Sequence, residues 1–285
     1  MWLYDFDIFY RAGRMILTGG SPYTVPGFFS PLPLAVLFAP LALLPKYVAY
    51  GIYVLASLWL LWRQARRRML WTALSFPVLF TLFVGQVDLA VALCLALLGP
   101  LALPVVLIKP QAALVAIPWI LRHSNTRALL VGLLLSLAVL SLCLLLRPTW
   151  IGAWWEALPS LEGYGRRDSN LYWLLPSGLR STVIIIALPV AVGLAFLLRE
   201  RSLSWTTVHL FSPVTNIYSA AVLSEWIDPI AMLLSWAAIF FVGGNIHNGA
   251  PMFVVGLAII ARRSRYGRLL WYKAAARVKS INRVQ

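Results

Sequence analysis

Two carboxylates and two arginines lie close together near the start of a chain that otherwise carries little charge. Asp5 and Asp7 precede Arg11 and Arg14 within the stretch Tyr4–Arg14, and the whole chain has only nine acidic residues. The chain is 61% apolar and 12% charged, with a mean hydropathy of +0.83. Ionisable groups beside a bilayer are costly and mark functional sites. We therefore expect this stretch to contact a lipid-borne substrate.

The spacing of charged and apolar residues in 5–18 predicts a helix that lies in a membrane interface. Asp7, Arg11, Arg14 and Thr18 fall on one face. The opposite face holds Phe6, Phe9, Tyr10, Gly13, Ile16 and Leu17. A helix with one charged and one apolar face lies along an interface instead of crossing it.

Apolar runs fill the rest of the chain and predict an all-α, polytopic membrane protein. At roughly 20 residues per span, little sequence is left for a soluble domain. Residues 128–146 form the clearest span, and residues 47–62 form another. The run 31–44 is interrupted by Pro33 and Pro40 and is too short to cross. Further apolar segments lie at 69–84, 181–198, 203–224, 229–242 and 251–261.

Three consecutive apolar runs, 89–98, 101–108 and 111–121, are each too short to cross about 30 Å as a helix. They are either broken helices that line a cavity or pieces of longer, kinked helices. Irregular backbone at membrane depth is tolerated only where protein or water covers it. The pattern therefore predicts a pocket in this part of the chain.

The basic residues predict the orientation. The net charge is +15, and half of the 24 basic residues lie in 63–68 and in the tail 262–285. The positive-inside rule makes both regions cytoplasmic in a multi-pass protein of the cell membrane. We expect one transmembrane domain over 1–261, with a non-cytoplasmic loop at 147–180. Residues 1–30 face this loop if the run 31–44 does not cross, which we expect, and lie on the cytoplasmic side if it does. Basic flanks explain the charge, so no nucleic-acid partner is expected.

Other residue types limit the possible chemistry. Cys94 and Cys143 lie inside apolar runs, which favours inert buried thiols over a disulfide framework. The three histidines share no ligand spacing, so no metal site is predicted. Neither a phosphate-binding loop nor a dinucleotide fingerprint is present, and no cofactor is expected.

Several short motifs, taken in order, resemble those of glycosyltransferase family 87, the GT-C type membrane transferases that depend on polyprenyl-phosphate mannose. The motifs are Asp5-Phe6-x-x-x-Tyr10-x-Ala12, Gly20-x-Pro22-Tyr23, Pro31-Leu32-x-x-Ala35, Gly85-Gln86-Val87-Asp88, Lys109-Pro110-Gln111 and, weakly, Ser212-Pro213 with Tyr218. The chain departs from the family in two ways. It begins at the acidic loop that normally follows a first span, and it has Val214 and Ser219 where the family has His and Asp.

The resemblance implies an inverting GT-C-like enzyme that moves a sugar, mannose in this family, from a polyprenyl-phosphate carrier to a lipid or glycan acceptor on the outer face. It places the general base on Asp5, a role that contributes about 10²–10⁴-fold in rate. The alternative for Asp5 is structural, because Asp5 is positioned to be the N-cap of a helix that begins at Phe6.

Nine further residues are candidate substrate-binding groups, and most also have a structural alternative. Asp7 can pair with Arg11 four residues later. Lys109 can be an interfacial lysine whose ammonium reaches water. Gln86 can hydrogen-bond a sugar hydroxyl or satisfy freed backbone groups. The nine candidates are Asp7, Tyr10, Arg14, Tyr23, Gln86, Lys109, Arg166, Arg167 and His247.

Two other classes of protein compete with the transferase. The missing first span and the replaced late His and Asp favour a catalytically inactive GT-C-like scaffold that assembles with another membrane protein. The breaks at Gly99-Pro100 and Lys109-Pro110 are typical of the discontinuous helices of a small transporter. The chain has no internal repeat, which is an argument against the transporter.

Overall fold

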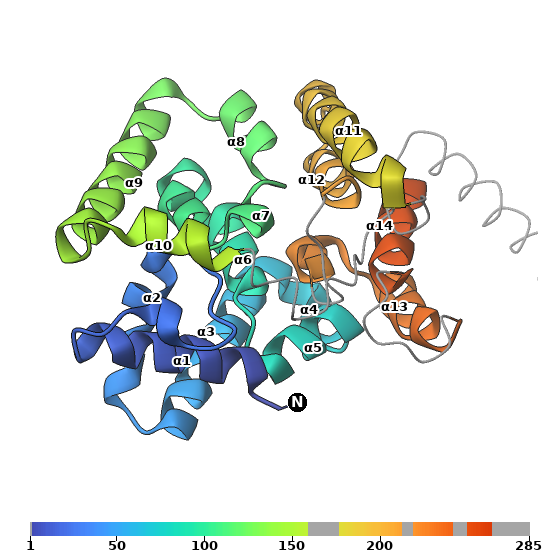
Figure 1. Ribbon diagram of the computed structural model, residues 1–285. Helices are drawn as coiled ribbons and strands as arrows, with labels where there is room; N and C mark the ends of the chain where they lie inside the picture. Colours follow the sequence, from blue (N-terminus) through green and yellow to red (C-terminus); the bar gives the residue numbers. More distant parts are fainter. Residues whose placement is uncertain (1, 159–176, 213–218, 242–249, 264–285) are drawn as a thin grey trace, which may run out of the picture.

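The computed structural model describes residues 2–158, 177–212, 219–241 and 250–263, and every regular element in these ranges is helical (Figure 1). The predicted all-α class is thereby confirmed. The α-helices are α1 (Tyr4–Leu17), α2 (Leu32–Phe38), α3 (Lys46–Ala65), α4 (Met69–Ala73), α5 (Phe76–Val84), α6 (Asp88–Leu98), α7 (Pro110–Ala113), α8 (Ile117–His123), α9 (Thr126–Leu146), α10 (Trp150–Ala157), α11 (Ser177–Leu197), α12 (Arg201–Leu210), α13 (Pro229–Phe241) and α14 (Ala250–Arg263). Short 3₁₀ segments connect several of them, and the longest are Gly99–Leu107 and Ser219–Trp226.

Among the described residues, two helical stretches are long and apolar enough to cross a membrane, namely Asp88–Leu107 and α9. A third is added if Lys46–Ala73 and Phe76–Val84, which meet at 98°, form one bent span. The span predicted at 128–146 corresponds to α9, and the one predicted at 47–62 lies in α3, which qualifies only as part of this bent pair. The helix in the run 31–44 is α2, with seven residues, which is as short as predicted.

Both alternatives for the three short runs occur: the first two runs are pieces of one longer helical stretch, and the third is broken. Residues 89–98 and 101–108 are not separate pieces, because the 3₁₀ segment Gly99–Leu107 continues α6. A proline at the start of a helical segment costs no hydrogen bond, so Pro100 does not end the stretch. Residues 111–121, in contrast, are broken into α7 and α8.

The prediction of one continuous apolar segment at 203–224 is wrong. The helix α12 ends at Leu210, and Ser219–Trp226 is a separate 3₁₀ segment. Several α12 side chains are polar and buried, so the helix packs inside the protein instead of presenting an apolar surface. They are Ser202, Ser204, Thr206 and His209.

The amphipathic N-terminal helix forms as predicted. Phe6 and Phe9 are buried on one face of α1, and Arg11 and Arg14 are exposed on the other. The Phe6 ring packs edge-on against α2 and α3, in line with the burial of the apolar face. Leu17, expected on the apolar face, is exposed at the end of the helix.

The beginning of the loop predicted at 147–180 packs on the segment that follows α1. The Arg147 guanidinium donates to the carbonyls of Gly19 and Gly20, and Trp154 Nε1 donates to the carbonyl of Phe29 over 2.9 Å. Figure 1 shows α10 lying over α2 at this end of the protein. Residues 19–29 and the start of the predicted loop therefore lie on the same side of the protein.

The boundary predicted between the helical domain and the basic tail is displaced. The helix α14 continues to Arg263, and its last two residues form ion pairs. Arg262 pairs with Asp228, and Arg263 Nη1 lies 3.6 Å from Glu200 Oε1. The first basic residues of the predicted tail are therefore fixed to the helical domain, and residues 264–285 lie outside the described ranges.

Candidate functional site

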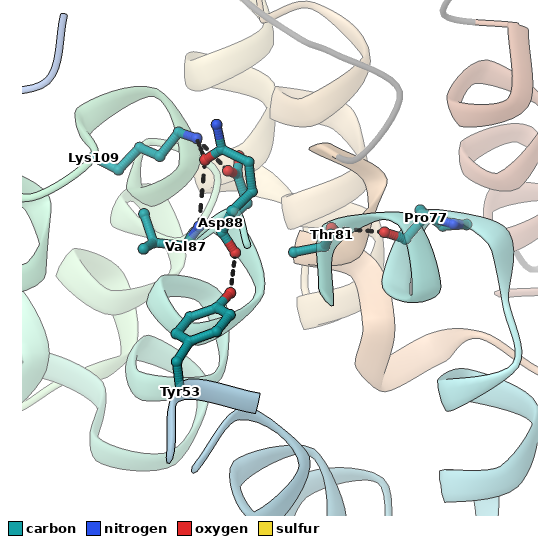
Figure 2. Close-up of polar contacts among 7 residues, drawn as sticks. Tyr53, Pro77, Thr81, Val87, Asp88 and Lys109 are labelled. Atoms are coloured by element: carbon teal, nitrogen blue, oxygen red, sulfur yellow. Dashed lines mark hydrogen bonds and ion pairs between the residues drawn. The ribbon is translucent and has the colours of Figure 1, made fainter. Parts of the chain in front are cut away.

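Three polar side chains form a buried cluster at the centre of the protein. The exposed fractions of Gln86, Asp88 and Lys109 are 6%, 1% and 5%. The Lys109 ammonium donates to Gln86 Oε1 and to Asp88 Oδ2. Figure 2 shows the ammonium directed at the start of α6. Because each buried charge has an opposite charge or a hydrogen-bond partner, the cluster is stable in an apolar interior.

The local backbone explains why these three residues meet. Gly85 ends α5 in the left-handed region, at φ 79°, and the chain then turns into α6 at Asp88. Lys109, at φ −148° and ψ 83°, is non-helical, as a residue before proline tends to be, and it precedes α7. The turn after α5 and the break before α7 thus bring the Gly-Gln and Lys-Pro motifs together.

Tyr53 attaches helix α3 to the same cluster. Its hydroxyl donates to the backbone carbonyl of Gln86, and the side chain is 7% exposed. Figure 2 shows the Tyr53 ring rising toward this carbonyl from α3. One helical turn earlier, Tyr50 donates to the carbonyl of Leu82 over 2.7 Å. The two tyrosines fix the turn between α5 and α6 against α3.

Asp5 adds a second carboxylate, which comes from α1 and keeps part of its surface exposed. The Gln86 side chain hydrogen-bonds the Asp5 carboxyl. Burial raises the pKa of Asp5 to about 6, against the opposing effects of the Lys109 charge and the Gln86 hydrogen bond, and the Asp88 charge raises it further. A carboxylate with this pKa is ionised at neutral pH and has an unusually high proton affinity for its type.

The N-cap alternative for Asp5 is wrong. Helix α1 begins at Tyr4, its N-cap is Leu3, and no side chain caps it. Asp5 lies in the first turn, and hydrogen bonding by the Gln86 side chain lowers the pKa of its carboxyl. The interfacial alternative for Lys109 is also wrong, because the ammonium is buried and paired with Asp88.

Gly85 allows α1 to approach this cluster. A Cβ added at Gly85 would lie 2.3 Å from the Cβ of Phe6, and the φ of 79° disfavours any side chain. We expect Gly85→Ala to lower the free energy of unfolding by at least about 1–2 kcal/mol. Gly51→Ala is the matched control, since Gly51 is helical with open space around it and should gain about 0.5–1 kcal/mol. Thermal unfolding in detergent measures both, and equal midpoints for the two variants would contradict the close approach.

The other described candidates lie outside the cluster. Asp7 Oδ2 pairs with Arg11 Nε at 2.9 Å, as its structural alternative predicted, and Asp7 Oδ1 also accepts from Lys46 Nζ at 2.9 Å. The Tyr10 hydroxyl donates to the carbonyl of Leu44. Tyr23 packs on Phe28, with ring centroids 5.7 Å apart, and Arg14 is exposed on α1.

The remaining candidates, Arg166, Arg167 and His247, lie outside the described residues. Asp88 is the site residue that sequence reasoning did not single out, although its motif was recognised. The available signal was an isolated acid at the start of a long apolar run, where only a buried cation can compensate its charge.

The geometry can support proton transfer. Asp5 is a partly exposed carboxylate of raised proton affinity, and it lies beside a fixed cation that favours its ionised form. These are the properties of a general base for a hydroxyl nucleophile. Comparisons of the chain with protein-family models, curated proteins and solved structures find no match.

Proposed function

We propose that this chain is a membrane glycosyltransferase that moves a sugar from a polyprenyl-phosphate carrier to a lipid or glycan acceptor. The observation that carries the proposal is the meeting of Asp5, Gln86 and Lys109. These residues come from three separate motifs, and each motif independently resembles its counterpart in glycosyltransferase family 87. A purely structural role for each motif gives no reason for all three to meet around one partly buried carboxylate.

In this proposal Asp5 is the general base. The Asp5 carboxylate accepts the proton of an acceptor hydroxyl while that oxygen bonds to the anomeric carbon of the sugar. The bond from the anomeric carbon to the phosphate oxygen breaks on the opposite face, and polyprenyl phosphate leaves with the electron pair. The configuration is inverted, and the proton remains on Asp5 until solvent removes it through the exposed side of the carboxyl.

Lys109 and Gln86 position and tune this base. The Lys109 charge lowers the proton affinity of Asp5 enough to keep it ionised at neutral pH, and the Gln86 amide orients the carboxyl. Asp88 in turn fixes the ammonium. The buried ammonium is unavailable to the departing phosphate, so Arg166, Arg167 and His247 remain the candidates for that contact.

The topology that fits this chemistry places α1 on the outer side. Helix α3 has 20 residues and is about 30 Å long, enough to cross the hydrocarbon core. Asp7 of α1 pairs with Lys46 at the start of α3, whereas the basic segment 63–68 lies at its other end. Since α2 is too short to cross, the positive-inside rule directs 63–68 to the cytoplasm and α1 to the outside.

One observation favours the alternative of a catalytically inactive scaffold. The described cavity beside the cluster, lined by Asp88, Gln111 and His209 among others, has room for about one water molecule and not for a sugar. A scaffold that associates with another membrane protein could retain the cluster as a structural element.

A transfer assay in membranes separates the two functions. We expect the chain to move label from a radiolabelled polyprenyl-phosphate sugar to an acceptor. Because the ionised form of Asp5 is the active form, kcat/KM should rise with pH through about 6 and then level off. If no polyprenyl-phosphate sugar in a panel supports transfer, the enzyme is rejected. If transfer occurs but kcat/KM does not rise with pH near 6, Asp5 is rejected as the base.

A further inference from the structure

The turn between α3 and α4 carries a group of exposed arginines that we name the arginine corner: Arg63, Arg66, Arg67 and Arg68. Arg66–Arg68 form a 3₁₀ turn, and Arg66 has a φ of 43°. A sharp turn presents neighbouring side chains in different directions but holds their charges close together. Four like charges at one corner repel one another unless an anion lies among them.

The arginine corner has no acidic partner in the part of the chain that the structure describes, whereas arginines elsewhere do. Arg11 pairs with Asp7, Arg201 with Glu225, and Arg262 with Asp228. Asp7, Glu225 and Asp228 thus neutralise other cations. No described carboxylate balances the arginine corner, which leaves its charges available to an external anion.

Tryptophans lie beside the arginine corner and indicate its depth in the membrane. Trp59, Trp62 and Trp71 are 57%, 53% and 37% exposed, and the Arg63 guanidinium lies 5.9 Å from the Trp59 ring centroid. Exposed tryptophan beside arginine is typical of the headgroup layer, where the indole ring contacts both lipid and water. At the other end of α3, Tyr47 is 65% exposed and stacks on Trp2, so aromatic groups flank both ends of the helix.

We propose that the arginine corner, together with Trp59 and Trp62, is a docking surface for the phosphates of anionic phospholipid headgroups. Guanidinium groups bind phosphate oxygens in a bidentate manner, and clusters of basic residues next to a membrane span bind anionic lipid. The inference depends on the membrane insertion proposed above but not on sugar transfer, because the arginine corner follows the C-terminal end of α3, whereas Asp5 lies on α1, which pairs with the N-terminal end of α3 through Asp7 and Lys46.

The test measures which lipids stay with the purified chain. The full-length protein is reconstituted in vesicles of phosphatidylcholine with a minor fraction of phosphatidylglycerol, extracted gently, and analysed for bound lipid by mass spectrometry. We expect strong enrichment of phosphatidylglycerol over its fraction in the vesicles. Arg66→Gln with Arg67→Gln should lower this enrichment at least about tenfold, since each arginine contributes separately at an anionic surface.

Two control variants make the result specific. Arg127→Gln with Arg199→Gln removes the same charge from exposed positions that have no arginine next to them in the sequence, and it should lower the enrichment much less. Arg66→Lys with Arg67→Lys keeps the charge and should retain most of the enrichment. This result would exclude misfolding as the cause of the loss in the glutamine variant. Equal loss in both glutamine pairs, or displacement of the lipid by soluble glycerol phosphate or a short oligonucleotide, would overturn the proposal.

Discussion

Replacing Asp5 by Asn should lower the rate of sugar transfer by about 10²–10⁴-fold and leave the protein folded. The amide can accept the same hydrogen bond from Gln86 but cannot take a proton from a hydroxyl. The loss should therefore appear in kcat, and binding of the donor should change little. Transfer of label in membranes, normalised to the amount of protein, measures the effect.

The stability of the same variant separates chemistry from folding. The pKa of Asp5 is about 6 in the folded protein and near 3.8 without the fold, so ionisation destabilises the native state. This cost is absent below pH 4, grows between pH 4 and 6, and is complete above 6, where a difference of two units corresponds to at most about 3 kcal/mol. We expect Asp5→Asn to unfold at the same or a higher temperature at neutral pH.

The matched control makes the same carboxylate-to-amide change far from the site. Asp228 caps α13 through its Oδ1, which accepts from the backbone N–H groups of Ile230 and Ala231, and Asn keeps this function. Asp228→Asn should leave transfer at the native rate. Retained transfer in Asp5→Asn would remove Asp5 from the mechanism.

The second large effect concerns the buried ion pair. Lys109→Met should lower the free energy of unfolding by about 3–5 kcal/mol, because it leaves the Asp88 carboxylate buried without a cation. Asp88→Asn should cost a similar amount for the converse reason. The double variant has no orphaned charge, so it should be clearly more stable than the sum of the two losses predicts. Chemical denaturation in detergent of the native chain, the two single variants and the double variant gives the coupling free energy between Lys109 and Asp88.

The pair also affects the base. Because the Lys109 charge lowers the pKa of Asp5, the rising limb of the pH profile should move to higher pH in Lys109→Met. If the Lys109–Asp88 pair were purely structural, its loss would change the stability but not the pH at which kcat/KM rises. Additive losses in the double variant, together with an unmoved limb, would contradict both the ion pair and its role.

The fold could be predicted where local pattern decides structure. The amphipathic period of α1 and the unbroken apolar length of α9 depend on neighbouring residues alone, and both helices form as expected. At Gly99-Pro100 the sequence left a broken helix and a longer kinked helix as alternatives, and the chain continues as 3₁₀ helix, because packing against α9 and α6 outweighs the local preference for a break. Packing of this kind is not encoded in the spacing of residues.

The site was predicted in its members but not in its arrangement. Asp5, Gln86 and Lys109 were identified from short motifs, and the structure brings these three together. Asp88 was not singled out, and the sequence did not predict that Lys109 would be buried and paired with it. The oxygen that the ammonium reaches depends on the turn at Gly85 and on the break at Lys109 before α7, and these become apparent only in three dimensions.

The packing of Phe6 against Gly85 has a consequence for the biosynthesis of the protein. Helix α1 is synthesised before its binding surface on Gly85 and before Gln86 and Lys109, the partners of Asp5. Until then Phe6 can pack against α2 and α3 but not against Gly85. A product truncated before Lys109 would contain Asp5 and Asp88 without the cation that acts on both, so the charge cluster exists only in chains that have passed this point.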